Sequence, residues 1–158
     1  MGNTEKKTRL NPLRMLLTLV MAVIPLVLAL LVLFNFRLVV TEGPSMEPTY
    51  TSGDLILCKK LSKEPQPGDL VLIQLQNGTM VLKRVAYVAG QDVSQGGHTG
   101  YWYTDHWRSD IVKDGYVFVL GDNPDESFDS RDEKFGLVPV SSIWGTPVFQ
   151  FDIGRGDG

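Results

Sequence analysis

The sequence predicts a mainly β fold, in which antiparallel strands form one domain that follows a single N-terminal transmembrane helix. Two observations lead to this prediction. Residues 15–36 form an uncharged apolar run, and the chain after it breaks into short apolar segments separated by glycine and proline. A chain of 158 residues has room for one folded domain beside the anchor.

The apolar run 15–36 is long enough to cross a membrane. As a helix it would span roughly 33 Å at about 1.5 Å per residue, and a hydrocarbon core is about 30 Å thick. Pro25 lies near its middle, where a membrane helix tolerates proline. The alternative is a cleaved secretory signal, whose apolar region is shorter and ends in small residues. The run is followed by Arg37 without an Ala-x-Ala sequence, so we expect an uncleaved anchor.

Charge predicts the direction of the anchor and excludes one class of partner. Segment 1–14 has one acid, Glu5, and its basic residues are Lys6, Lys7, Arg9 and Arg14. Basic flanks stay in the cytoplasm, so we expect 1–14 to be cytoplasmic and 37–158 to be extracytoplasmic. The net charge of the whole chain is −3, so the body after this basic segment is acidic, which argues against a nucleic-acid partner.

Five segments after the anchor have the composition of strands. The expected ranges are 54–59, 69–75, 80–89, 116–120 and, more weakly, 144–151. Between two of them, Asn77-Gly78 favours a two-residue type I′ hairpin turn, which places Gln76 opposite Thr79. The aromatic segments 101–107 and 143–151 either pack on the sheet or rest on lipid.

The same hairpin register places Leu72 opposite Lys83. Alternation along the strand then puts Val81, Val85 and Tyr87 on the same face as Lys83. Lys83 is therefore a cation among apolar neighbours. It either extends its ammonium group to water or stays on this face with a chemical role.

The cysteine, the histidines and the acidic segment of the chain give only weak signals of a functional site. Cys58 is the only cysteine, and its place in an expected strand favours packing in the core. His98 and His106, with a single cysteine, have no metal-ligand spacing, so we expect no metal. The acidic segment 121–131 does not match an EF-hand loop in either possible register.

Four short motifs follow the anchor in order, and together they resemble the bacterial type I signal peptidases. They are Ser-Met-x-Pro-Thr at 45–49, Gly-Asp-Leu at 68–70, Leu-Lys-Arg-Val at 82–85 and Gly-Asp-Asn-x-x-x-Ser-x-Asp-Ser-Arg at 121–131. The resemblance implies a mostly β catalytic domain at 37–158. It also implies a membrane-bound serine endopeptidase that removes signal peptides from exported preproteins, cleaving after small residues of the Ala-x-Ala type.

The resemblance also assigns roles to five residues. It implies that Ser45 is the nucleophile and Lys83 the general base, that Ser127 orients Lys83, and that Asp129 and Arg131 form a supporting ion pair. The chemistry is consistent, because a serine needs a base and a buried lysine can become one when burial lowers its pKa. A Ser-Lys dyad requires no cofactor.

The chain departs from the family pattern in three places. Gly43 stands where many members have a hydroxyl residue that helps to form the oxyanion hole. The backbone N–H of Ser45 remains one expected donor, and an N–H made accessible by Gly43 is the possible second. Pro124 replaces a residue that is often basic, and residues 132–134 lengthen the last motif region slightly.

The expected location follows from the anchor and the resemblance. Ser45 lies shortly after the anchor, so it should sit near the outer surface of a bacterial cell membrane, where preproteins emerge. Two alternatives remain open: a dedicated Ser-Lys protease for a specialised substrate, and a non-enzymatic anchored module that uses Arg155-Gly156-Asp157 as an adhesion sequence.

Overall fold

The computed structural model describes residues 11–98, 101–102 and 108–151. The chain divides into two compact units, with the boundary between Asn35 and Phe36. The expected features at Lys6, Lys7, Arg9, His106 and Arg155-Gly156-Asp157 lie outside the described residues, as do the side chains of the aromatic segment 101–107.

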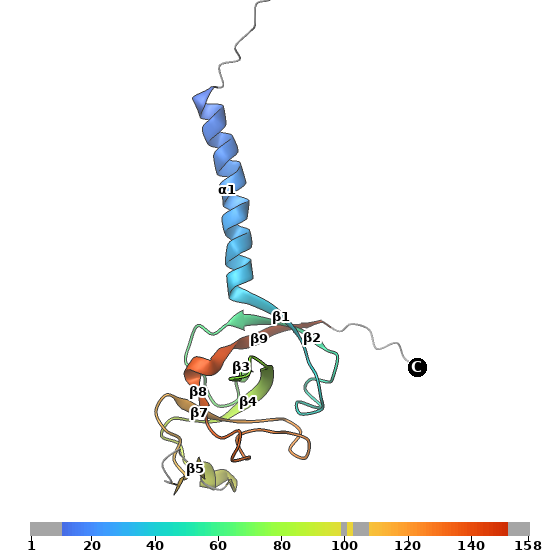
Figure 1. Cartoon of the computed structure of the whole chain (residues 1–158), viewed down its shortest axis with the longest axis vertical. Helices are drawn as coiled ribbons and strands as arrows, with labels where there is room; N and C mark the ends of the chain where they lie inside the picture. Colours follow the sequence, from blue (N-terminus) through green and yellow to red (C-terminus); the bar gives the residue numbers. More distant parts are fainter. Residues whose placement is uncertain (1–10, 99–100, 103–107, 152–158) are drawn as a thin grey trace, which may run out of the picture. The chain divides into compact units, whose positions relative to one another are not determined.

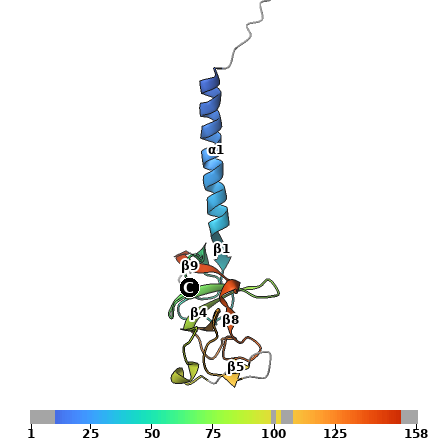
Figure 2. The same cartoon turned by 90° about the vertical axis from the view of Figure 1, so that its left-hand side faces the viewer.

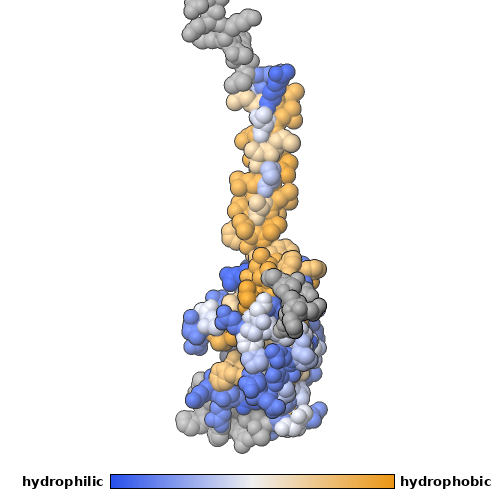
Figure 3. Space-filling model, turned by 90° about the vertical axis from the view of Figure 1, so that its right-hand side faces the viewer, coloured by the Kyte–Doolittle hydropathy of each residue, from blue (hydrophilic) through white to orange (hydrophobic). Residues whose placement is uncertain are grey.

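The first unit contains helix α1 (Pro12–Asn35). Asn11 caps it, since its side-chain oxygen accepts from the Leu13 N–H at 3.1 Å and Pro12 occupies the first helical position. Pro25 lies inside the helix, and no helix residue is buried. Figure 3 shows an almost continuous apolar column along the helix. It is the one helix in the described part of the chain that is long and apolar enough to cross a membrane.

The second unit is a β domain. Its strands are β1 (Phe36–Val40), β2 (Leu55–Lys60), β3 (Leu70–Gln74), β4 (Met80–Val88), β5 (Tyr101–Trp102), β6 (Arg108–Ser109), β7 (Tyr116–Leu120), β8 (Val138–Pro139) and β9 (Ile143–Phe151), with 3-10 turns at Val93–Gly96 and Val140–Ser142. Seven strands form one antiparallel sheet in the order β1-β2-β9-β3-β4-β7-β8, and β5 pairs with β6 (Figures 1 and 2). The predicted mainly antiparallel β fold behind one apolar helix is confirmed.

The five expected strands correspond to β2, β3, β4, β7 and β9 within one residue at each end. The sequence did not predict β1, because its residues continue the apolar run of the anchor. The helix ends at Asn35, so Phe36 belongs to the sheet. Strands β5, β6 and β8 have only two residues each, too few for a periodic pattern.

The predicted register of the β3–β4 hairpin is wrong by one residue. The strands pair Gln74 with Met80 and Val71 with Lys83, so the loop is longer than two residues. The Gly78 N–H donates to the Leu75 carbonyl at 2.9 Å, and Gly78 has φ of 84°. This is a turn followed by a left-handed glycine, the usual three-residue hairpin loop, in which glycine avoids a steric penalty.

The predicted face of β4 is also interrupted. Val81 and Val85 pack together in one core cluster, but Tyr87 packs in another with Phe118. The cause is a bulge: Val85 pairs with Val119 and Tyr87 with Phe118, so one residue of β4 has no partner. A bulge shifts the side chains that follow it to the opposite face.

Three apolar clusters form the described core of the β domain. Cys58 is fully buried in one of them, which confirms its packing role, and burial raises the pKa of its thiol to about 11. Strand β9 divides between two environments. Ile143 and Trp144 pack against the core, whereas Phe149 and Phe151 are exposed.

Candidate active site

A cleft of about 520 Å³ brings Ser45 and Lys83 together. Its walls come from the loop after β1, from the beginning of β4 and from the loop after β7. Strand β7 pairs with β4 only from Arg84 onward, so the edge of β4 from Met80 to Leu82 borders the cleft without a β7 partner. We refer to this space as the main cleft.

Ser45 lies in a short turn whose neighbours are anchored in the core. Met46 and Tyr50 are buried, and the Tyr50 N–H donates to the Met46 carbonyl at 2.9 Å. The Ser45 carbonyl accepts from the Asn123 N–H at 3.1 Å, which ties this turn to the loop after β7. Within the described residues no acceptor binds the Ser45 N–H, so it is available to a ligand.

Lys83 is only 3% exposed, so the alternative in which its ammonium group extends to water is wrong. Its Nζ donates to Ser127 Oγ at 3.1 Å. Burial lowers the pKa of Lys83; the nearby Asp129 carboxylate opposes this effect and the Arg131 guanidinium supports it. A lowered pKa favours the neutral amine, which is the form that can accept a proton.

Asp129 and Arg131 form the expected ion pair beside this lysine. Arg131 Nη2 lies 2.8 Å from Asp129 Oδ2, and the Gly121 N–H donates to the same oxygen at 2.8 Å. Burial raises the pKa of Asp129, but hydrogen bonds from Arg131, Gly121 and Ser127 outweigh it and hold the pKa at about 2. Asp129 is therefore a permanent anion that Ser127 connects to Lys83.

Gly121 allows the two halves of the site to approach each other. A Cβ at this position would lie 2.1 Å from Ser127 Oγ and 2.4 Å from the Ser45 carbonyl oxygen. Any side chain would force Ser127 or the Ser45 turn away. The sequence contains this glycine in the Gly-Asp-Asn motif, but only the structure shows the close approach that requires it.

Sequence reasoning missed a second network beside the first. Arg84 donates to Asp122 through Nε at 2.8 Å and Nη2 at 2.6 Å, and Thr49 Oγ1 donates to Asp122 at 2.5 Å. The Arg84 guanidinium lowers the pKa of Asp122. These residues connect the Ser45 turn to β4 directly beside Lys83. All three lie within the quoted motifs, so a signal was present, although sequence alone does not show that they meet.

Gly43 lines the main cleft, but its own N–H donates to Ser52 Oγ at 3.3 Å. Its φ is 80°, a conformation that side-chain-bearing residues rarely adopt. A hydroxyl residue at position 43 would therefore be strained in this backbone. The described residues contain no group of three His, Cys, Asp or Glu side chains that could hold a metal ion.

A serine and a buried, hydrogen-bonded lysine on one cleft, in a chain with a membrane-type helix, fit the class of membrane-anchored serine peptidases. The family model described as signal peptidase, peptidase S26, matches residues 13–102 and 95–151. The chain therefore belongs to the signal peptidase family, peptidase S26.

The relatives include bacterial, mitochondrial and chloroplast proteins. The chain is 32% identical over 155 residues to signal peptidase I of Bacillus caldolyticus, covering 79% of this chain and 84% of the relative. It is 37% identical over 119 residues to the mitochondrial ATP-independent inner membrane protease subunit 1b of Arabidopsis thaliana. That alignment covers 68% of this chain and 65% of the relative, just under two thirds of its length.

A solved signal peptidase I from Enterococcus faecalis is 24% identical to the chain, with a TM-score of 0.39. The match covers 54% of this chain and 98% of the other.

Proposed function

We propose that this protein is a membrane-bound serine endopeptidase that removes N-terminal signal peptides from exported preproteins, cleaving after small residues of the Ala-x-Ala type. Ser45 is the nucleophile and Lys83 its general base. The observation that carries the proposal is the buried Lys83 amine, which shares the main cleft with Ser45 and is held by Ser127.

In the proposed reaction the Lys83 amine takes the proton of the Ser45 hydroxyl as Oγ bonds to the substrate carbonyl carbon. The Ser45 N–H donates to the oxyanion, and an N–H near Gly43 is the proposed second donor. The C–N bond then breaks, and Lys83 gives its proton to the leaving amine. Water hydrolyses the acyl-enzyme with Lys83 again acting as base. Ser127, Asp129 and Arg131 keep the amine in position.

The shape of the main cleft supports a peptide substrate. The edge of β4 from Met80 to Leu82 has no β7 partner, so an extended peptide can pair with it as an added strand. Main-chain pairing of this kind would hold the carbonyl group of the cleaved bond next to Ser45. It requires no particular side chain along most of the substrate, which suits an enzyme that processes many preproteins.

The proposed location is a bacterial cell membrane that the chain crosses once. The basic segment 1–14 stays in the cytoplasm, and residues 37–158 form the extracytoplasmic catalytic domain. The partners are secreted preproteins and the lipid bilayer. The single membrane-type helix in the described residues and the relatives named signal peptidase I support this arrangement.

The second candidate is a dedicated Ser-Lys protease for a specialised substrate. It is favoured by the 37% identity to a relative named as a mitochondrial inner membrane protease subunit. Cleavage of several unrelated signal peptides with Ala-x-Ala sites would support the general enzyme. Cleavage of only one natural substrate, at any enzyme concentration, would support the dedicated one.

The test is the pH–rate profile of the full chain in detergent with a preprotein substrate, measured beside Ser45→Ala and Lys83→Ala. We expect each variant to lose at least about a thousandfold in kcat. Wild-type activity should fall as the pH drops through a Lys83 pKa that lies below that of free lysine. Ser141→Ala and Lys60→Ala, at exposed positions outside the main cleft, serve as matched controls. A folded Lys83→Ala variant with wild-type activity would exclude the dyad.

A further inference from the structure

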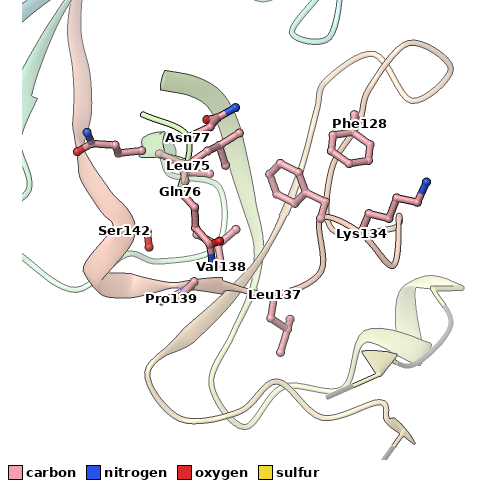
Figure 4. A pocket seen from close by; sticks show the side chains of 12 residues that line it. Leu75, Gln76, Asn77, Phe128, Lys134, Leu137, Val138, Pro139 and Ser142 are labelled. Atoms are coloured by element: carbon pink, nitrogen blue, oxygen red, sulfur yellow. The ribbon is translucent and has the colours of Figure 1, made fainter. Parts of the chain in front are cut away.

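A second cavity of about 400 Å³ adjoins the main cleft. Leu75, Phe128 and Phe135 line both spaces, so these three residues form the border between them. The other walls of the second cavity come from the β3–β4 hairpin and from the segment around Val138. In Figure 4 the Phe128 ring lies across the gap from Leu75 and Asn77, and the Lys134 side chain extends away from it.

The lining suits a short stretch of peptide with an apolar side chain. Phe128 and Phe135 pack edge to face with ring centroids 5.4 Å apart. Phe128 is nevertheless 53% exposed, so much of this ring is available to a ligand. Opposite the rings, Gln76 and Asn77 offer amide groups that can bind a peptide backbone. Apolar walls with a few polar groups are typical of ligand pockets.

The chemistry of the proposed reaction decides which part of the substrate reaches this cavity. Lys83 must deliver its proton to the nitrogen of the residue that follows the cleaved bond. That residue therefore lies on the Lys83 side of Ser45. Lys83 Nζ donates a hydrogen bond to Ser127 Oγ at 3.1 Å, and Phe128 directly follows Ser127 in the sequence. Phe128 lines the second cavity as well as the main cleft, so this cavity lies close to the group that protonates the first residue after the cleaved bond.

We propose that the second cavity, bounded by Phe128, Phe135 and the hairpin residues Leu75–Asn77, binds an apolar side chain from the first few residues after the cleaved bond. This inference rests on the proposed function, since it assumes peptide cleavage at Ser45. It makes Phe128 a specificity-determining residue. It also predicts that the enzyme selects substrates by residues after the cleaved bond as well as by residues before it.

The experiment uses peptides that are identical up to the cleaved bond and carry either leucine or glycine at one of the first few positions after it. With the full chain in detergent, we expect leucine at one of these positions to raise kcat/KM about tenfold, through KM, which corresponds to about 1.4 kcal/mol. Phe128→Ala should bring the leucine-to-glycine ratio close to one. Phe128→Leu, which keeps an apolar wall, should retain most of the ratio.

Phe149→Ala is the matched control, because Phe149 is 57% exposed and lines neither cavity; it should keep the wild-type ratio. Equal cleavage of all peptides by the wild type would overturn the second cavity as a subsite while leaving the proposed function intact. The subsite would also be overturned if Phe128→Ala kept the wild-type leucine-to-glycine ratio of kcat/KM. The same holds if Phe128→Ala changed only the preference for residues before the cleaved bond. Failure to cleave any peptide would overturn both proposals.

Discussion

At Lys83 a single side chain links stability to the proposed chemistry. The amine is almost completely buried, and burial is the main cause of its lowered pKa. The unfolded chain therefore binds a proton at this lysine more readily than the folded chain does. Stability is reduced at pH values below the folded pKa, and the deficit disappears as the pH rises through the unfolded pKa of about 10.4.

We therefore expect Lys83→Met to be inactive but more stable than the wild type, because a similar volume remains without an amine to desolvate. The melting temperature should rise by a few degrees at neutral pH, and the gain should shrink as the pH approaches 10. Thermal unfolding at several pH values measures it, with Lys60→Met at an exposed position as control. A Lys83→Met variant that is less stable at every pH would contradict this account.

At the level of elements, the site depends on how three segments are held together. The turn that contains Ser45 receives a hydrogen bond from the Asn123 N–H, and Thr49 at its end binds Asp122. Asp122 in turn holds Arg84 on β4, next to Lys83. The network thus sets the position of the nucleophile turn relative to the strand that carries the base, although none of its side chains is proposed to react.

Thr49→Val should lower kcat roughly three- to tenfold, with little change in KM, because it removes one charge-assisted hydrogen bond that positions Ser45. Thr49→Ser should restore most of the rate, since it keeps the hydroxyl. Steady-state kinetics on a preprotein measures both, with Thr146→Val on β9 as the control. The positioning role is excluded if valine and serine variants behave alike.

At the level of the whole molecule, the two units differ in how their apolar side chains are accommodated. None of the residues of α1 is buried, whereas all three described core clusters belong to the β domain. The sheet also has an apolar outer face, where β1, β2 and β9 align in rows. Leu38, Leu57 and Phe149 form one row and Val40, Leu55 and Phe151 another. Four of these six side chains are among the large exposed apolar residues.

Residues 36–158 should therefore fold without the helix and still bind lipid vesicles through this outer face. Replacing Leu38 and Phe149 together by serine should weaken vesicle binding by at least about tenfold, since each apolar side chain contributes on the order of 1 kcal/mol or more. Vesicle flotation measures it, with Ile111→Ser, 47% exposed outside this face, as the control. Unchanged flotation of the double variant would exclude the outer face as a lipid contact.

The local pattern of the sequence was sufficient to predict the helix and five of the strands. Apolar length predicted α1, and short apolar segments between glycine and proline predicted β2, β3, β4, β7 and β9. These features depend on neighbours close in the chain. The candidate residues Ser45, Lys83, Ser127, Asp129 and Arg131 came instead from the resemblance of four motifs to one family, and their roles stay predictions.

Features that depend on distant contacts needed the tertiary structure. The hairpin at Asn77 could close with two residues or three, and the pairing of whole strands selected three. The bulge that moves Tyr87 off the face of Lys83 arises from pairing with β7. Burial of Lys83 lowers the pKa of its amine, and the groups that modify this shift, Asp122, Asp129 and Arg131, come from the loop after β7, far from Lys83 in the sequence. Residue type and spacing are properties of a short segment, whereas register, burial and the meeting of Ser45 with Lys83 are set by the packing of the whole sheet.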